Sequence, residues 1–253
     1  MSNLQTLKFY CTPAHRCSYL PDREAVTLFL DPKTEVSAEV YSSLTGVGFR
    51  RSGDFIYRPH CGTCHACIPV RIPVNQFEAN RSQKRCLERN ADLMVVSAPP
   101  RYTPEYYALY EKYINARHQD GDMYPPTRNQ FRSFLLCSWG NSRFYEFRAE
   151  GRLVALAVVD HVETGMSAVY TFYDPAEEAR SPGRYVILWQ IAEARKRLQG
   201  YVYLGYWIRQ CRKMSYKREY QPLEYFDGQH WLRPDPDGYR PDGYRPPVTT
   251  IQG

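Results

Sequence analysis

Three cysteines stand at a spacing that suits metal binding. The segment HCGTCHAC places Cys61, Cys64 and Cys67 in a strict C-x2-C-x2-C arrangement. Thiolates at this spacing can hold a soft metal ion, and a zinc site or an iron–sulfur cluster then needs a fourth ligand from elsewhere in the chain. The spacing does not distinguish zinc from iron–sulfur, and free thiols packed in a small lobe are the alternative. The candidates for the fourth ligand are Cys17, His60, His65 and Cys11.

A second feature with chemical meaning is the positive charge of residues 180–218. This segment holds ten Lys and Arg against one acid, Glu193, a net charge of +9, whereas the whole chain carries +6. Cations that meet phosphates and rings that stack on bases suit a single-stranded nucleic acid. A solvated basic face over an aromatic core is the alternative. The interleaved aromatic residues are Tyr185, Trp189, Tyr201, Tyr203, Tyr206, Trp207 and Tyr216.

These features depend on elements predicted between residues 167 and 220. Ser167–Tyr173 alternates small and aromatic residues and reads as a half-buried strand, which the Asp174-Pro175 pair ends. A helix is predicted from about Arg184, because apolar residues recur at three- and four-residue steps as far as Gly200. Tyr201–Ile208 is a second aromatic strand. A strand, a loop at a helix N-terminus and a second strand form a place where backbone amides can meet an anion.

The chain divides into three parts on composition and pattern. Residues 1–100 form a smaller lobe with the cysteine cluster, and residues 101–233 carry the helices and strands of the main domain. Residues 234–253, where PDGYR occurs twice, are predicted to be an irregular tail because they are rich in Pro and Gly. No run approaches 18 apolar residues and the first ten residues lack a signal-peptide pattern, so a cytoplasmic protein without a membrane span is expected.

Several strings in the central stretch resemble a known family. SAVYTFYDP, Gly183-x-Tyr185, LGYWIRQCRKMSYK and Tyr220-x-Pro222 are similar to the C-terminal half of the arginyl-tRNA–protein transferases, most of all the bacterial aspartate/glutamate leucyltransferase branch. The resemblance implies an α/β (α+β) fold with an acetyltransferase-like (GNAT) C-terminal core. The predicted order of three strands, a helix and a fourth strand agrees with such a core.

The same resemblance implies a reaction. Leucine would pass from leucyl-tRNA to the N-terminal amine of proteins that begin with Asp or Glu, which marks them for degradation through the N-degron (N-end rule) pathway. The sequence contains no P-loop, G-x-S-x-G, H-E-x-x-H or G-x-G-x-x-G motif. This fits aminoacyl transfer, because the ester is already activated and an α-amine with a pKa of about 7.7–8.0 is partly free base at neutral pH. Holding the two together can supply most of the rate.

The resemblance and the chemistry together suggest site residues. Asp174 is the candidate proton acceptor or orienter of the amine, with capping of the strand-to-loop turn as the alternative. Arg50 and Arg51, in the family-like string GFRRSG, could bind the carboxylate of an acidic acceptor, with ordinary surface charge as the alternative. The residues expected to flank the tRNA 3′ end or its phosphates are Tyr170, Tyr206, Lys213 and Lys217.

The resemblance also bears on the cysteines and leaves other activities open. Cys17, in a Cys-x-Tyr-Leu string similar to the family's first cysteine motif, becomes the preferred fourth ligand, although Leu20 stands where eukaryotic relatives have a second cysteine. Arginine as the donor amino acid, or a non-catalytic RNA-binding protein with a metal-binding lobe, are the alternatives. An acetyltransferase that uses coenzyme A is disfavoured, since the loop RSPGRY has few glycines for a pyrophosphate.

Overall fold

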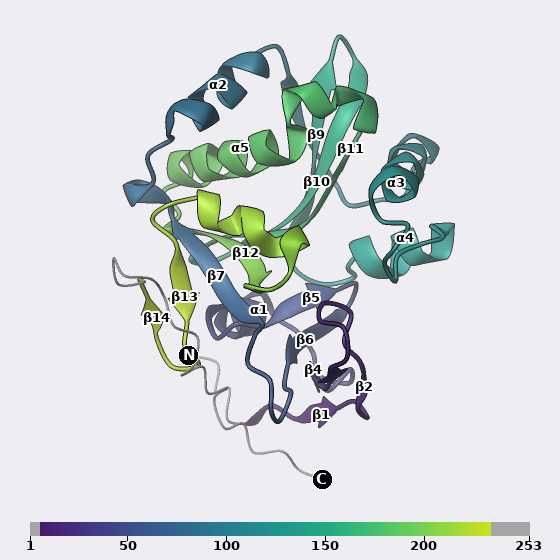
Figure 1. The fold of residues 1–253 in the computed structure, drawn as a ribbon, viewed down its shortest axis with the longest axis vertical. Helices are drawn as coiled ribbons and strands as arrows, with labels where there is room; N and C mark the ends of the chain where they lie inside the picture. The colour runs from purple at the N-terminus through teal and green to yellow at the C-terminus, as the bar shows by residue number, and fades with distance from the viewer. Residues whose placement is uncertain (1–5, 234–253) are drawn as a thin grey trace.

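The computed structural model describes residues 6–233, so the predicted tail at 234–253 lies outside the described residues. The protein is a mixed α/β structure built on an eight-stranded sheet and a four-stranded sheet, with a short two-stranded ribbon of β2 (His15–Arg16) and β3 (Glu24–Ala25). Figure 1 shows the four-stranded sheet at one end of the large sheet. No helix in the described part of the chain is long and apolar enough to cross a membrane.

The eight-stranded sheet is mostly antiparallel, with β11 and β12 as a parallel pair. It draws β7 and β8 from the first hundred residues, so the expected boundary at residue 100 does not coincide with a division between the sheets. Its strands, in the order in which they lie side by side, are β14 (Trp231–Leu232), β13 (Glu224–Phe226), β7 (Ile68–Pro73), β12 (Tyr201–Trp207), β11 (Gly165–Tyr173), β10 (Arg152–Val162), β9 (Ser142–Ala149) and β8 (Met94–Ala98).

Helices cover both faces of this sheet. The α2 helix (Arg81–Arg89) and α5 (Pro182–Lys196) lie on one face, and α3 (Pro104–Arg117) and α4 (Arg128–Leu135) lie on the other (Figure 1). Because successive strand residues point to opposite faces, Phe147 and Ala157 enter the core under α5, while Phe144 and Leu156 enter the core under α3. The short 3-10 helices are η2 (Val74–Gln76), η3 (Pro175–Arg180) and η4 (Arg212–Glu219).

The four-stranded sheet has one packed face and one open face. Its strands lie in the order β1 (Phe9–Cys11), β4 (Thr27–Leu30), β6 (Phe55–Pro59) and β5 (Arg50–Ser52). Leu28, Leu30 and Ile56 pack with Tyr41 and Leu44 of the α1 helix (Ala38–Gly46) to form a small core. The residues that alternate with them point to the opposite face, where Tyr10 and Phe55 are each 52% exposed.

The parallel pair β11 and β12 diverges after a short contact. Only Gly165–Ser167 pairs with Tyr201–Tyr203, although both strands continue for several residues. The register of each strand shifts beyond that point, where β11 meets β10 and where β12 meets β7 at Gly205. Gly205 has φ +76°, a left-handed conformation that glycine adopts without strain. The divergence leaves backbone groups between the two strands that must find other partners.

Much of the predicted pattern is observed with small shifts at the ends. The predicted strands at 167–173 and 201–208 correspond to β11 and β12, and the helix expected from Arg184 begins at Pro182. The spacing of Phe131, Phe134 and Leu135 predicts a helix over Thr127–Trp139, but α4 ends at Leu135 because Leu136 is extended. The sequence Thr103-Pro104-Glu105 is typical of a helix start, and Thr103 does cap α3, accepting a hydrogen bond from the Tyr106 N–H with Pro104 in the first turn.

Candidate functional site

Arg50 enters the opening between β11 and β12. Its Nη2 donates to the Ala168 carbonyl at 2.5 Å, and a Cβ added to Gly205 would lie 3.4 Å from its Nε. The residue is only 8% exposed, and its Nη1 has no hydrogen-bond partner among the described residues. A buried cation with an unused donor is costly unless something charged or polar completes it. This makes the opening a candidate site for an anion.

Arg51, the next residue, faces the other way. Its guanidinium meets Asp160 through two bonds, Nε to Oδ2 at 2.7 Å and Nη2 to Oδ1 at 2.8 Å, and Nη2 also reaches the Ser142 hydroxyl. Both side chains are almost fully buried, at 0% and 2% exposure. Tyr41 donates a further hydrogen bond to Asp160 at 2.7 Å. This pair fixes the four-stranded sheet to the large sheet and leaves the Arg51 guanidinium engaged and buried, unlike the acceptor-binding role expected for it.

Lys217 lies beside this opening and is buried rather than exposed. Its ammonium group donates to the Tyr206 carbonyl, and Met214 Sδ lies 3.2 Å away. Burial, and next the charge of Arg50, lowers the pKa of Lys217 from 10.5 to about 7. A lysine only 4% exposed cannot reach a tRNA phosphate as we expected for it. It adds instead to the positive potential around Arg50.

Tyr206 is also less accessible than expected. The ring is 5% exposed, and its hydroxyl donates to the Gly48 carbonyl at 2.9 Å and approaches the Tyr57 carbonyl at 3.4 Å. The ring of Tyr57 lies 6.4 Å from that of Tyr206, centre to centre. A buried, hydrogen-bonded ring is not free to stack on a base, so Tyr206 supports the wall of the site in this structure.

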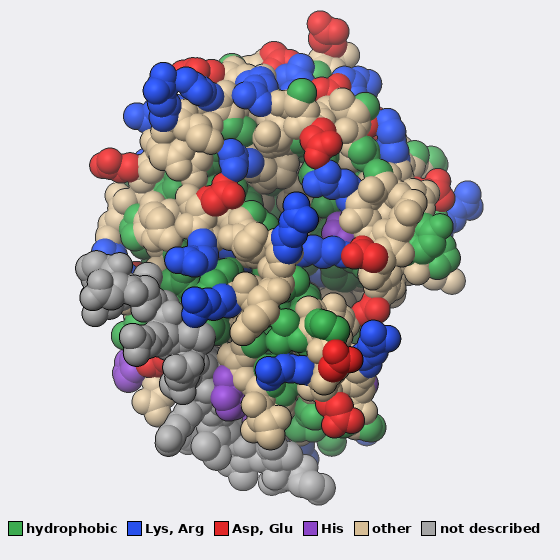
Figure 2. Space-filling model, in the orientation of Figure 1, with side chains coloured by type: hydrophobic (Ala, Val, Ile, Leu, Met, Phe, Trp, Pro, Cys, Tyr) green, Lys and Arg blue, Asp and Glu red, His purple; other side chains and the backbone are tan. Residues whose placement is uncertain are grey.

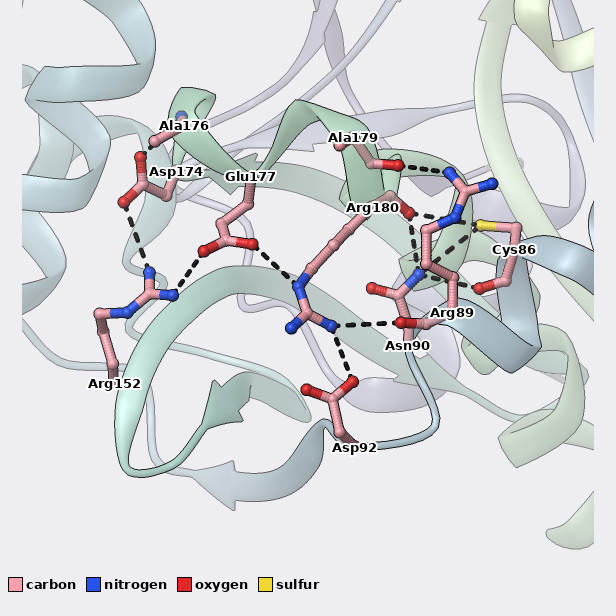
Figure 3. Close-up of polar contacts among 10 residues, drawn as sticks. All are labelled: Cys86, Arg89, Asn90, Asp92, Arg152, Asp174, Ala176, Glu177, Ala179 and Arg180. Carbon is pink, nitrogen blue, oxygen red and sulfur yellow. Dashed lines mark hydrogen bonds and ion pairs between the residues drawn. The ribbon is translucent and has the colours of Figure 1, made fainter.

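Asp174 caps a helix and is surrounded by cations. Its side chain accepts a hydrogen bond from the Ala176 N–H at 2.9 Å, Lys112 pairs with it at 2.6 Å and Arg152 lies 3.7 Å away. Burial opposes ionisation, but the hydrogen bonds from Lys112 and the Ala176 backbone and the charge of Arg152 outweigh it, so the pKa of Asp174 is lowered. Figure 3 shows the cap together with the ion pairs Arg152–Glu177 and Glu177–Arg180. A paired carboxylate with a lowered pKa is a weak proton acceptor.

Tyr170 and Lys213 lie at the side of the site that faces α3. Tyr170 is partly buried between the rings of Tyr113 and Phe134, and burial raises the pKa of its hydroxyl well above the usual value. Lys213 is exposed and pairs with Asp120 at 2.6 Å. Of the two lysines expected to contact phosphate, only Lys213 is accessible in this structure.

The basic stretch is partly neutralised. Four of its cations pair with acids, namely Arg180, Arg184, Arg197 and Lys213. Figure 2 shows Lys and Arg side chains across the middle of the face that carries α5, with Asp and Glu among them. Within the described part of the chain, the buried Lys217 forms no ion pair, and Arg195 donates to the backbone carbonyls of Val74 and Phe77. The remaining cations of residues 180–218 that form no ion pair there are Lys196, Arg209, Arg212 and Arg218.

The four cysteines come together beside the open face of the small sheet. Cys17, Cys61, Cys64 and Cys67 line one cavity of about 180 Å³. Burial, and then the neighbouring Cys17, Cys61 and Cys64, raises the pKa of Cys67 to about 12. Among the described residues, no group of three or more His, Cys, Asp or Glu side chains is arranged to hold a metal ion. The thiols are therefore neighbours, but their present arrangement is not that of a ligand set.

The sequence analysis missed two residues that shape the site, and signals for both were present. Gly205 is an isolated glycine within a strand pattern, which indicates a bulge or a close backbone approach. Tyr57 lies opposite Arg50 because Gly53-Asp54 forms a two-residue hairpin loop between β5 and β6. Reading that hairpin from GFRRSGDFIY would have paired Arg50 with Tyr57.

Comparison with known proteins finds two family models that match this chain. The family model described as "Arginine-tRNA-protein transferase, N terminus" matches residues 15–85, and that described as "Arginine-tRNA-protein transferase, C terminus" matches residues 105–227. The chain is 59% identical over 232 residues to proteins named aspartate/glutamate leucyltransferase from Pseudomonas fluorescens (strain SBW25) and Stutzerimonas stutzeri (strain A1501). Each alignment covers 92% of this chain and 99% of the relative.

A solved structure, that of L-PGS from Bacillus licheniformis, is similar at 9% identity and a TM-score of 0.43 over 66% of this chain and 49% of that one, a level that defines no common fold. The sequence relationship is much closer and spans both lobes. The family expected from the short strings is thus confirmed: this chain belongs to the arginine-tRNA–protein transferase family, in its aspartate/glutamate leucyltransferase branch.

Proposed function

We propose that this chain transfers leucine from leucyl-tRNA to the α-amine of proteins that begin with Asp or Glu. The observation that carries the proposal is 59% identity over 99% of the length of relatives named for this activity. The main domain supports it with the strand order expected of an acetyltransferase-like (GNAT) core: β9, β10 and β11 are followed by α5 and by β12 parallel to β11.

The reaction needs little from the protein beyond position and charge. The amine nitrogen attacks the ester carbonyl carbon of leucyl-tRNA and forms the peptide bond. The ester C–O bond breaks, the 3′-terminal ribose oxygen leaves, and the proton lost by the amine ends on that oxygen. Holding amine and ester in contact supplies most of the rate, and donors aimed at the developing oxyanion supply more.

We assign recognition of the acidic acceptor to Arg50. Its guanidinium lies between Ala168 of β11 and Gly205 of β12, and its buried Nη1 has no hydrogen-bond partner in the described part of the chain. Lys217 is nearby, and no carboxylate is paired to either group among the described residues. The side-chain carboxylate of an N-terminal Asp or Glu would complete this pair of cations through charge-assisted hydrogen bonds. An acceptor with a neutral or basic side chain would leave Arg50 buried and unpaired.

We propose that the donor tRNA lies along the basic segment 180–218. The unpaired cations Lys196, Arg209, Arg212 and Arg218 are the groups that phosphates would meet, with Lys213 able to exchange Asp120 for a phosphate. A tRNA donor implies the cytoplasm, where aminoacyl-tRNA is made, and leucine at the N-terminus implies delivery of the product to the N-degron pathway.

We also retain a zinc or iron–sulfur site at Cys17, Cys61, Cys64 and Cys67 as a proposal. What supports it is that the four thiols line one cavity; binding would require them to move into a common ligand geometry. Metal analysis and absorbance spectra of anaerobically purified protein test it. Bound zinc or iron would support the site, and four freely reactive thiols with no metal would refute it.

The experiment that tests the function mixes the purified protein with individually charged tRNAs and with peptides that begin with Asp, Glu, Lys, Arg or Ala. Mass spectrometry identifies the product. Leucine on the Asp and Glu peptides is the expected result. Added arginine would assign the sister activity, and tRNA binding without any product would favour a non-catalytic RNA-binding protein.

A further inference from the structure

A row of aromatic side chains crosses the open face of the four-stranded sheet and ends at Arg50. Cross-strand partners place Tyr10 opposite Phe29, Phe29 opposite Tyr57, and Tyr57 opposite Arg50. Directly paired residues of antiparallel strands point to the same face. The row therefore runs over β1, β4, β6 and β5, at right angles to the strands, from the surface to the proposed acceptor site.

Phe29 in the middle of this row contacts two further rings, and Tyr10 and Phe55 on the same face are half exposed, whereas Phe29 and Tyr57 are partly buried. The ring of Phe29 lies 5.9 Å from that of Tyr57 and 6.2 Å from that of Phe55, which precedes Tyr57 by two residues on the same face. Tyr10 and Phe55 are each 52% exposed, although the opposite face of the sheet is packed against α1. Large aromatic side chains left half exposed on one face of a sheet are typical of a surface that binds something.

The charge around the row distinguishes between the two substrates. Residues 6–67 hold seven Lys and Arg and six Asp and Glu, a net of +1, whereas residues 180–218 carry +9. Tyr10 even directs its hydroxyl to a carboxylate, Asp31, at 3.5 Å. A nucleic acid would bring a phosphate with every base to a surface that has few cations to meet it. A polypeptide brings no such charge.

We infer that this aromatic row binds the acceptor polypeptide, over the residues that follow its N-terminal Asp or Glu. The inference rests on the proposed function, since Arg50 fixes where the acceptor begins. Strands lie about 4.8 Å apart, so three steps from β5 to β1 span about 14 Å, which an extended peptide at about 3.3 Å per residue covers with about four residues. The row thus contacts roughly the second to the fifth residue of the acceptor.

The test measures how transfer depends on acceptor length. Peptides of two, five and eight residues that begin with Glu are compared in kcat/KM with leucyl-tRNA as donor. We expect kcat/KM to rise from two to five residues and then to level off. In Phe55→Ala and in Tyr10→Ala, the eight-residue acceptor should lose about fivefold or more in kcat/KM, the effect of truncating one aromatic contact. The dipeptide acceptor and the KM for leucyl-tRNA should not change.

The control variant is Met94→Ala, which removes a side chain that is 67% exposed on β8, at the other edge of the large sheet. It should leave all acceptors unaffected. Equal losses for short and long acceptors in Phe55→Ala would overturn the inference, and a raised KM for leucyl-tRNA alone would assign the row to RNA. Binding of a fluorescent eight-residue Glu peptide without tRNA gives a second readout. Weaker binding by Phe55→Ala supports the row even if no transfer occurs, and unchanged binding contradicts it.

Discussion

The adjacent residues Arg50 and Arg51 lie on opposite faces of the four-stranded sheet and differ in how completely their guanidinium groups are hydrogen-bonded. On the inner face, Arg51 is paired with Asp160 and hydrogen-bonded to Ser142. On the outer face, Arg50 has one carbonyl partner and an unused nitrogen. The inner-face Arg51 is satisfied within the chain, as a buried polar group usually is. The outer-face Arg50 keeps an unused buried donor, which a bound anion could complete.

The largest expected effect tests the inner face. Arg51→Met leaves Asp160 buried with only Tyr41 as partner, and removal of one member of a buried ion pair costs about 3–5 kcal/mol in the free energy of unfolding. Urea denaturation measures this loss. The double variant Arg51→Met/Asp160→Leu should recover part of it, because it removes the orphaned charge. A single-variant loss below about 1 kcal/mol would remove the contrast between the two faces.

The next effect tests the outer face. Arg50→Met removes one hydrogen bond to a backbone carbonyl, so the free energy of unfolding should fall by only about 1 kcal/mol. Transfer to Asp and Glu acceptors should nevertheless fall by about tenfold to a hundredfold, the value of a charged hydrogen bond of about 1.5–3 kcal/mol. Steady-state kinetics with Glu peptides and a fixed excess of leucyl-tRNA measure it. Unchanged kinetics would place acceptor recognition elsewhere.

A smaller effect concerns Lys217, beside Arg50, and is seen in how the free energy of unfolding depends on pH. Because burial, followed by the charge of Arg50, lowers the pKa of Lys217 to about 7, the folded protein loses this proton near neutral pH while the unfolded chain keeps it up to about pH 10.5. In that window the free energy of unfolding should rise with pH, by up to about 1.4 kcal/mol per unit, relative to Lys217→Met. Below pH 7 both states hold the proton, and the difference should be flat. Urea denaturation at pH 6, 7.5 and 9 measures it, and parallel curves would show an ordinary lysine.

The smallest effect separates the acceptor face from the tRNA surface. Arg209→Ala with Arg212→Ala should reduce the slope of log binding constant against log salt for tRNA by about one to two units, because each lost phosphate contact removes about 0.9. Lys217→Met should leave the slope unchanged, because the buried amine meets no phosphate. A slope that changes in Lys217→Met but not in the double arginine variant would reverse this assignment.

The sequence predicted local features well and distant contacts poorly. The strands around Tyr170 and Tyr206 and the capped helix at Thr103 follow from periodicity and turn chemistry over a few residues. Cys61, Cys64 and Cys67, which are close in the sequence, line one cavity, although no group of three or more possible ligands among the described residues is arranged to hold a metal.

Whether a charged side chain is buried, paired or exposed, by contrast, depends on partners far along the chain. Arg51 meets a carboxylate 109 residues away, and Arg50 meets a carbonyl 118 residues away. Two adjacent arginines therefore look equivalent in the sequence, although alternation along a strand sends them to opposite faces. The same reason explains Lys217, whose burial depends on its contact with β12 rather than on its basic neighbours.

The position of β7 has a consequence for biosynthesis. Ile68–Pro73 is made early, yet both strands that flank it, β12 and β13, come from the last third of the chain. At about 5–20 residues per second a ribosome needs on the order of ten seconds to add the roughly 130 residues up to β12. During that interval neither edge of this largely apolar segment has its native partner strand. We therefore expect the nascent chain to be bound by chaperones that hold extended hydrophobic segments.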